Sequence, residues 1–199
     1  MIVVAAPLGL EARALRRGAP GLRVLRTGMG PARARRAAER LRADPASAVA
    51  VAGLCGALVP DLEPGDVLVA SSVEDEHGGA AELETVGVCR ALRAIGIDPR
   101  VGRIICTDHF AHGRERERLA LGGAVAADME SAWLAAGAGH RPLAVVRVVI
   151  DGPRHELWRP AAARQLLLGL RRLREIAPAL ERWAEGLGVK QPSLGTMES

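Results

Sequence analysis

Three acidic residues of types that bind hydroxyls or exchange protons, Glu11, Glu130 and Asp151, each lie at or shortly after the end of an apolar stretch. The stretches are Ile2–Ala6, Ala124–Ala127 and Leu143–Ile150. Short continuous apolar runs are typical of strands buried on both faces, and open α/β sheets bind ligands beyond the carboxyl ends of such strands. We therefore expect these carboxylates to meet at one edge of a sheet.

The pair Asp128 and Glu130 stands where a strand of small residues gives way to a helix, predicted over Met129–Ala138. Asp128 could accept hydrogen bonds from the first-turn amides of that helix. Glu130 would then be free to accept hydrogen bonds from paired hydroxyls, such as those of a ribose. A simple helix cap is the alternative, because acidic residues in a first turn are common.

Glu11 and Asp151 also have two interpretations each. Glu11 lies in the first turn of a helix predicted over 8–16, where a carboxylate interacts favourably with the helix dipole. Asp151 precedes Gly152-Pro153, so it could simply start a turn. At the ends of buried strands, both are also placed to face a ligand.

Two glycine-containing stretches could approach a ligand closely. Thr27-Gly28-Met29-Gly30-Pro31 joins a strand predicted over 22–26 to a helix over 31–41, and its amides could bind an anion. A dinucleotide site would need a third glycine at Arg33 and an acid about 20 residues on, so that class is excluded. Gly53-Leu54-Cys55-Gly56 follows a strand over 47–52, and its missing Cβ atoms permit close approach.

The composition favours one enzyme-sized domain. The chain has 199 residues, 49% of them hydrophobic, which suits a single core over 1–187 and a polar, disordered tail over 188–199. One Phe, three Trp and no Tyr offer few stacking platforms for single strands, and the net charge of +4 comes from arginines interleaved with acids. We therefore expect no nucleic-acid partner.

No cofactor, metal site or membrane span is expected. Cys55, Cys89 and Cys106 have no metal-ligand spacing, and His77 stands alone in an acidic loop. Helical hydrophobicity does not extend over the ~20 residues that a bilayer requires, and no basic leader precedes Met1–Ala6. These features predict a cytoplasmic protein.

Two stretches together carry a family resemblance. Val51–Leu58 with Leu62–Val69 resembles the Gly-rich loop and "pGD-hydrophobic" strand of the superfamily of purine nucleoside phosphorylases and methylthioadenosine/S-adenosylhomocysteine nucleosidases, and Met129-Glu130 resembles its ribose-binding Met-Glu. The resemblance implies a single-domain α/β fold, a three-layer sandwich with a central mixed twisted sheet flanked by helices. Gly9–Arg13 and the short chain are most similar to the hopanoid-associated nucleoside phosphorylase branch.

The resemblance also implies roles for individual residues. Asp151 would protonate the purine at N7, and Glu11 would position the attacking water. Contacts to the substrate are implied for Glu130, Met129, Phe110, Gly53, Thr27 and Gly28. For Phe110, packing in the core is an equal alternative. The family pattern "R-x-x-S" before the catalytic aspartate keeps its arginine as Arg147 but has Ile150 in place of the serine.

These roles predict an enzyme that cleaves the N-glycosidic bond of a purine nucleoside, a 5′-modified adenosine. The resemblance also implies a homo-oligomer, such as a dimer. Hydrolysis is favoured because neither glycine stretch contains an arginine for phosphate. Phosphorolysis is the alternative, using Arg33 or an arginine of a partner subunit. Two further hypotheses are a non-catalytic nucleoside-binding protein, because the serine is missing, and a thiol hydrolase using Cys55.

Overall fold

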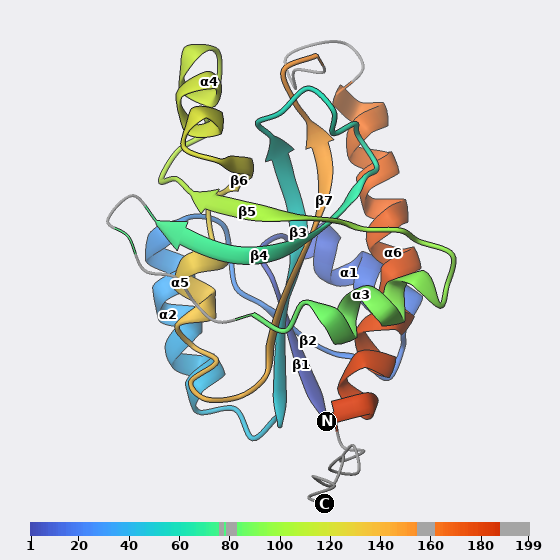
Figure 1. Ribbon diagram of the computed structural model, residues 1–199. Helices are drawn as coiled ribbons and strands as arrows, with labels where there is room; N and C mark the ends of the chain where they lie inside the picture. Colours follow the sequence, from blue (N-terminus) through green and yellow to red (C-terminus); the bar gives the residue numbers. More distant parts are fainter. Residues whose placement is uncertain (76–77, 79–82, 155–161, 188–199) are drawn as a thin grey trace, which may run out of the picture.

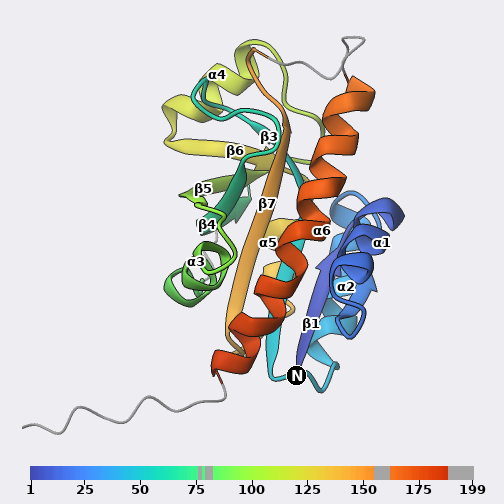
Figure 2. The same ribbon diagram turned by 90° about the vertical axis from the view of Figure 1, so that its right-hand side faces the viewer.

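The computed structural model describes residues 1–75, 78, 83–154 and 162–187. His77 of the acidic loop and the tail over 188–199, which we expected to be disordered, lie outside the described residues. The described part has three layers, with helices on both faces of a central mixed sheet (Figure 1, Figure 2).

The described chain has seven strands and six helices, which alternate except that β4 follows β3 directly. The strands are β1 (Ile2–Ala6), β2 (Arg23–Arg26), β3 (Ala48–Ala57), β4 (Val67–Asp75), β5 (Arg100–Cys106), β6 (Ala124–Asp128) and β7 (Leu143–Asp151). The helices are α1 (Gly9–Gly18), α2 (Pro31–Arg42), α3 (Val86–Arg93), α4 (Arg114–Leu121), α5 (Ser131–Ala135) and α6 (Ala162–Leu187). Each predicted strand and helix is present, and the mixed α/β fold class is confirmed.

Strand β3 is the hub of the sheet. The strand order is β2-β1-β3-β6-β5-β4-β7, and β3 also pairs with β7, so the pairing closes on itself. β3 runs parallel to β1 and β7 and meets β6 antiparallel at its end, after an irregularity between Cys55 and Gly56. This arrangement brings the carboxyl ends of β1, β3, β6 and β7 to one region of the molecule.

Alternate side chains of the central strands form two cores, as expected for a sheet covered on both faces. Val4 of β1 and Ala50 of β3 belong to a core with α1, α3 and α6. Val3 and Val49 point the other way, into a core with α2 and α5. Figure 1 shows these two helical layers on opposite sides of the sheet.

Helix α1 and helix α6 cross with their backbones in contact at Gly18. A Cβ atom built on Gly18 would lie 1.9 Å from the carbonyl oxygen of Arg174. Only glycine permits this approach, because real Cβ atoms do not come so close to a backbone oxygen.

The structure corrects three expected boundaries. The stretch Gly53–Gly56 is part of β3 rather than a loop. Helix α5 starts later than predicted, because Asp128 binds the amides of Glu130 and Ser131 before the helix begins, and it ends at Ala135, where the bonds from Gly137 to Leu134 and from Ala138 to Ala135 form tighter turns. A helix over 160–187 is expected from the sequence to be interrupted near Pro178, but α6 runs through this residue without a break.

The apolar face of α6 explains its continuity. An interior proline costs a helix about 3 kcal/mol, because it removes a hydrogen bond and clashes with the preceding turn. On either side of Pro178, the side chains of Ile176, Ala177, Ala179 and Leu180 are buried. The apolar spacing of Leu166, Leu170, Leu173 and Ile176 predicts a helical stripe that covers the sheet, and these side chains do pack in the core with the central strands.

None of the described helices combines the length and the apolar composition needed to cross a bilayer.

Candidate active site

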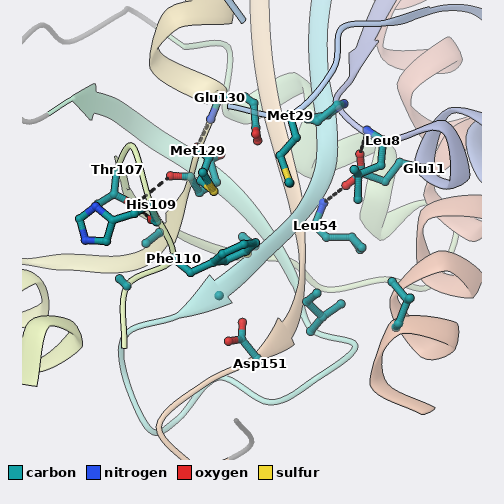
Figure 3. Close-up of a pocket in the computed structure, with 18 of the residues that line it drawn as sticks. Leu8, Glu11, Met29, Leu54, Thr107, His109, Phe110, Met129, Glu130 and Asp151 are labelled. Atoms are coloured by element: carbon teal, nitrogen blue, oxygen red, sulfur yellow. Dashed lines mark hydrogen bonds between the residues drawn. The ribbon is translucent and has the colours of Figure 1, made fainter. Parts of the chain in front are cut away.

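Glu11, Glu130 and Asp151 line one cavity of about 340 Å³. Its walls come from the carboxyl ends of β1, β3, β6 and β7, from the loop after β5, and from the first turn of α6. In Figure 3 the three carboxylates lie on different sides of this cavity, with the ring of Phe110 between them. The expected meeting of the acids at one edge of the sheet is therefore observed.

The carboxylate of Glu11, in the first turn of α1, is held by two backbone hydrogen bonds. Its Oε2 accepts a hydrogen bond from the amide of Leu8 at 2.6 Å, and its Oε1 accepts one from the amide of Leu54 at 2.8 Å (Figure 3). Burial raises the pKa of Glu11, and the nearby guanidinium of Arg147 offsets part of this effect. A carboxylate with a raised pKa is a better base toward water than an exposed one.

Arg147 is the buried centre of the acidic cluster. It lies in β7, is fully buried, and its Nε is 2.7 Å from Oδ2 of Asp128. Its Nη2 is 4.0 Å from Oε2 of Glu130 and donates to Oγ of Ser131 at 2.8 Å. Among the described residues, its Nη1 has no hydrogen-bond partner.

Sequence reasoning noted Arg147 only as part of a family pattern and missed this central position. The available signal was a charged residue inside the apolar run Leu143–Ile150, because a buried arginine is rare unless it is paired.

Asp128 accepts hydrogen bonds from backbone amides at the start of α5, as predicted. Its Oδ1 accepts hydrogen bonds from the amides of Glu130 at 3.1 Å and Ser131 at 3.0 Å, and its Oδ2 accepts one from the Ser131 hydroxyl. Burial opposes ionisation of this side chain, but Arg147 and the hydrogen bonds outweigh it and lower the pKa of Asp128. Asp128 is therefore the ionised partner of Arg147, which leaves Glu130 to face the cavity.

Glu130 is the N-cap residue of α5 and is also buried. Its Oε1 accepts a hydrogen bond from the amide of Gly30 at 2.8 Å, so the loop before α2 touches the site through this glycine. Burial, reinforced by the negative charge of Asp128 and opposed by Arg147, raises the pKa of Glu130 to about 7. Glu130 can therefore change its protonation state near neutral pH.

Asp151 ends β7 at the opposite side of the cavity. Its Oδ2 is bonded by Nη2 of Arg116, a residue of α4 that also lines the cavity. The side chain of Ile150, which stands where the family pattern has serine, packs against Gly169 of α6. Sequence reasoning did not foresee Arg116, because it lies in a charged run that resembles a solvated helix face.

Much of the remaining wall is apolar. Phe110, Met129 and Met29 line the cavity together with Leu54 and Leu166. Figure 3 shows Phe110, Met129 and Met29 around its centre. Phe110 is 58% exposed, so it is not a core residue. Its exposed ring in the cavity wall suits a flat, apolar ligand group.

The other predicted contact residues do not line the cavity in the described part of the structure. Thr27 and Gly28 belong to the loop, but their amides bond to the carbonyls of Ala6 and Pro7 and extend the β1 pairing. Gly53 lies beneath the site, where a Cβ atom would come within 2.4 Å of Nη1 of Arg147 and 2.9 Å of Oε1 of Glu11. Gly53 does permit a close approach to its backbone, as expected, but the groups that approach it are the side chains of Arg147 and Glu11 and not a ligand.

Cys55 lines the cavity, but burial raises the pKa of its thiol, which keeps it protonated and unreactive. The ring nitrogens of His109 face Asp108 and Glu115 rather than a thiol. Within the described ranges, no three potential metal ligands come together.

The three-layer α/β fold with an acid-lined cavity at the carboxyl ends of its strands has the architecture of an enzyme. The chain belongs to the phosphorylase superfamily, whose sequence profile matches residues 18–166. No curated protein sequence matches the chain.

Several solved structures share the fold. A mutant of the futalosine hydrolase of Helicobacter pylori superposes with a TM-score of 0.77 at 17% identity, covering 93% of this chain and 98% of that one. The 5′-methylthioadenosine/S-adenosylhomocysteine nucleosidase of Campylobacter jejuni gives 0.81 at 15% identity, with the same coverage. The S-adenosylhomocysteine nucleosidase of Streptococcus pyogenes, in complex with 5-methylthiotubericidin, gives 0.76 at 19% identity, covering 94% and 97%.

Proposed function

We propose that this enzyme hydrolyses the N-glycosidic bond of a purine nucleoside that carries an apolar 5′ substituent. The observation that carries the proposal is the placement of Glu11, Glu130 and Asp151 around one cavity. Fold relatives that are nucleosidases or bind nucleoside analogues agree with it. The expected base is adenine, as in the named substrate of the Campylobacter jejuni relative.

The three acids would divide the work of breaking this bond. Cleavage passes through an oxocarbenium-like sugar, and the departing base takes the electron pair of the broken bond. The base must therefore be protonated to leave as a neutral group, and a nucleophile must be in place at C1′. Asp151 would deliver a proton at purine N7, Glu130 would accept hydrogen bonds from the ribose 2′ and 3′ hydroxyls, and Glu11 would orient the attacking water. Phe110 would cover a face of the base.

A water site is supported beside Glu11. Nη1 of Arg147 and Oε1 of Glu11 both lie against Gly53, and this Nη1 has no hydrogen-bond partner among the described residues. A buried donor without a partner favours an ordered water, which could bond to both groups. A water held in this way would have an acceptor for its proton and a fixed orientation.

Charge favours water over phosphate as the nucleophile. The described lining contains Glu11, Asp128, Glu130 and Asp151, whereas Arg116 and the buried Arg147 are each paired with one of these acids. Arg33, the candidate phosphate ligand, is not among the described lining residues, and its Nη1 donates to the carbonyl of Met29. A phosphate dianion would therefore find no cation without an acidic partner among the described lining residues.

The 5′ substituent is proposed to be apolar because one side of the cavity is lined by apolar side chains. Leu8, Met29 and the first turn of α6, with Ala162 and Leu166, line it without a charged group among them. An alkylthio group or a longer hydrocarbon would remove this surface from water, at about 25 cal/mol per Å².

The test is to incubate the protein with adenosine, methylthioadenosine and a panel of 5′-modified adenosines and inosines, with and without phosphate. Free base formed without phosphate is the expected result, and Asp151→Asn should lower its rate by about 10²–10⁴. Asp98→Asn, a change at an exposed carboxylate, is the control. Formation of ribose 1-phosphate would show that the reaction is phosphorolysis and not hydrolysis. Binding of a nucleoside without turnover would show that the protein is a nucleoside-binding protein and not an enzyme.

The predicted homo-oligomer stays a prediction, which light scattering after size-exclusion chromatography would check.

A further inference from the structure

Arg116 is the one residue of α4 whose side chain reaches deep into the cavity wall. Helix α4 has no buried residue, and yet the side chain of Arg116 is only 11% exposed, as is expected when an arginine serves a specific partner. Its Nε donates to the carbonyl of Ala111 and its Nη1 to the carbonyl of Ala57, both at 2.9 Å. With Nη2 on Asp151, all three nitrogens of the guanidinium are engaged.

The pocket for this ion pair is built to fit. A Cβ atom on Gly56 would lie 2.7 Å from Oδ1 of Asp151 and 3.4 Å from Nη2 of Arg116, so the pair occupies space that only a glycine leaves open. The two carbonyls that fix the guanidinium come from the end of β3 and from the loop after β5. The orientation of Asp151 is thereby tied to two other elements of the site.

We propose that Arg116 is a positioning residue that acts through Asp151, in the place left by the absent serine before this aspartate. The proposal rests on the proposed function. Ile150 has no hydroxyl to donate and packs on α6, whereas Arg116 supplies a charged donor to the same carboxylate. Charge-assisted hydrogen bonds are about twice as strong as neutral ones.

The chemical consequence follows from the proton transfer. When the base leaves, the O–H bond of protonated Asp151 breaks and an N–H bond forms at N7, while the electron pair of the C1′–N9 bond moves to the base. Water bonds to C1′ and gives a proton to Glu11. Arg116 faces the carboxylate that remains, so it stabilises Asp151 after donation more than before and promotes the transfer.

The test uses Arg116→Gln, Asp151→Asn and the double variant, on the best substrate of the panel. Arg116→Gln should lower kcat by about 10²-fold with KM changed by less than about threefold, because the loss falls on the transition state. The alkaline limb of its pH–rate profile should move to higher pH, because the carboxylate loses a favourable charge. In the Asp151→Asn background, Arg116→Gln should cost less than about twofold, because residues that act through one another are not additive.

Two further variants separate positioning from folding. Arg118→Gln changes a charge on the same helix, but its side chain is 73% exposed, so kcat and the pH profile should not change. Arg116→Lys keeps the charge and should restore part of kcat and return the alkaline limb toward that of the wild type. It serves in place of Arg116→Gln should that variant not fold.

The outcomes are distinct. Two results would overturn the proposal: losses of kcat that multiply in the double variant, or a lower kcat in Arg116→Gln with an unmoved alkaline limb. Either would show that Arg116 only holds α4 in place, and the proposed function would still stand. A wild-type protein that cleaves no nucleoside of the panel would overturn the proposed function and this role with it.

Discussion

Replacing Glu130 by glutamine should make the folded protein more stable at pH 8, with a gain that shrinks toward pH 5. The carboxyl group is buried with its pKa raised to about 7, from an ordinary value of 4.5. An acid whose pKa is raised on folding contributes stability that is complete below the unfolded pKa and is lost as pH rises through the folded pKa. The affected window is therefore from about pH 4.5 to about pH 7. Glutamine stays neutral throughout and can still accept the hydrogen bond from Gly30.

The magnitude follows from the size of the shift. A rise from 4.5 to about 7 is about 2.5 pKa units, and at 1.36 kcal/mol per unit the full effect is about 3 kcal/mol. Between pH 5 and pH 8, about 2 to 3 kcal/mol of it should be expressed. Because Glu130 is only 4% exposed, solvent screening takes little away.

The assay is urea unfolding of both proteins at pH 5, 6, 7 and 8. The free energy of unfolding of the variant, minus that of the wild type, should rise with pH across this range. Glu39→Gln, at an exposed glutamate of α2, is the matched control and should give a difference that does not vary with pH. A Glu130→Gln curve parallel to that of the wild type at every pH would refute the reasoning.

The same titration should appear in substrate binding, with the opposite sign. In the proposed function, the ionised carboxylate would accept hydrogen bonds from two ribose hydroxyls, whereas the protonated group would have to use one oxygen as a donor. KM of the wild type should therefore fall as pH rises through about 7, and that of Glu130→Gln should be higher and flat.

Three other changes test the site. Arg147→Met should destabilise the fold by about 3–5 kcal/mol in urea unfolding, because it leaves the buried charge of Asp128 without its cation; a smaller loss when Asp128→Asn is added would show that the pair is responsible. Gly53→Ala should cost about 1–3 kcal/mol, since its Cβ would overlap Nη1 of Arg147, and a neutral result would contradict the close packing. Phe110→Ala should raise KM about tenfold with a stable fold, because stacking of a base on an aromatic ring contributes about 1–3 kcal/mol; an unchanged KM would exclude base contact.

The sequence predicted the strands and the three acids because both depend on local pattern. Apolar runs mark buried strands, and an acid at the end of such a run keeps its place whatever the rest of the chain does. Glu11, Glu130 and Asp151 lie in the cavity for this reason.

The contacts between distant elements could not be predicted in the same way. Arg116 lies 35 positions from Asp151, in a run of alternating charges, and nothing local distinguishes it from Arg118. The glycine loop before α2 was expected to act through Thr27 and Gly28, but the register of β1 with β2 engages their amides and leaves Gly30 to reach Glu130. These assignments depend on how strands align, which short-range spacing does not encode.

The contact at Gly18 has a mechanical consequence. Helix α1 carries Glu11 at one end and is locked to the backbone of α6 at the other, while the first turn of α6 forms part of the wall of the cavity. A ligand group that displaced this turn would therefore also shift α1, the helix that carries Glu11. Smaller side chains in the first turn of α6 would enlarge the cavity for bulkier ligands. Because such substitutions leave the backbone of α6 in place, they would not move Glu11.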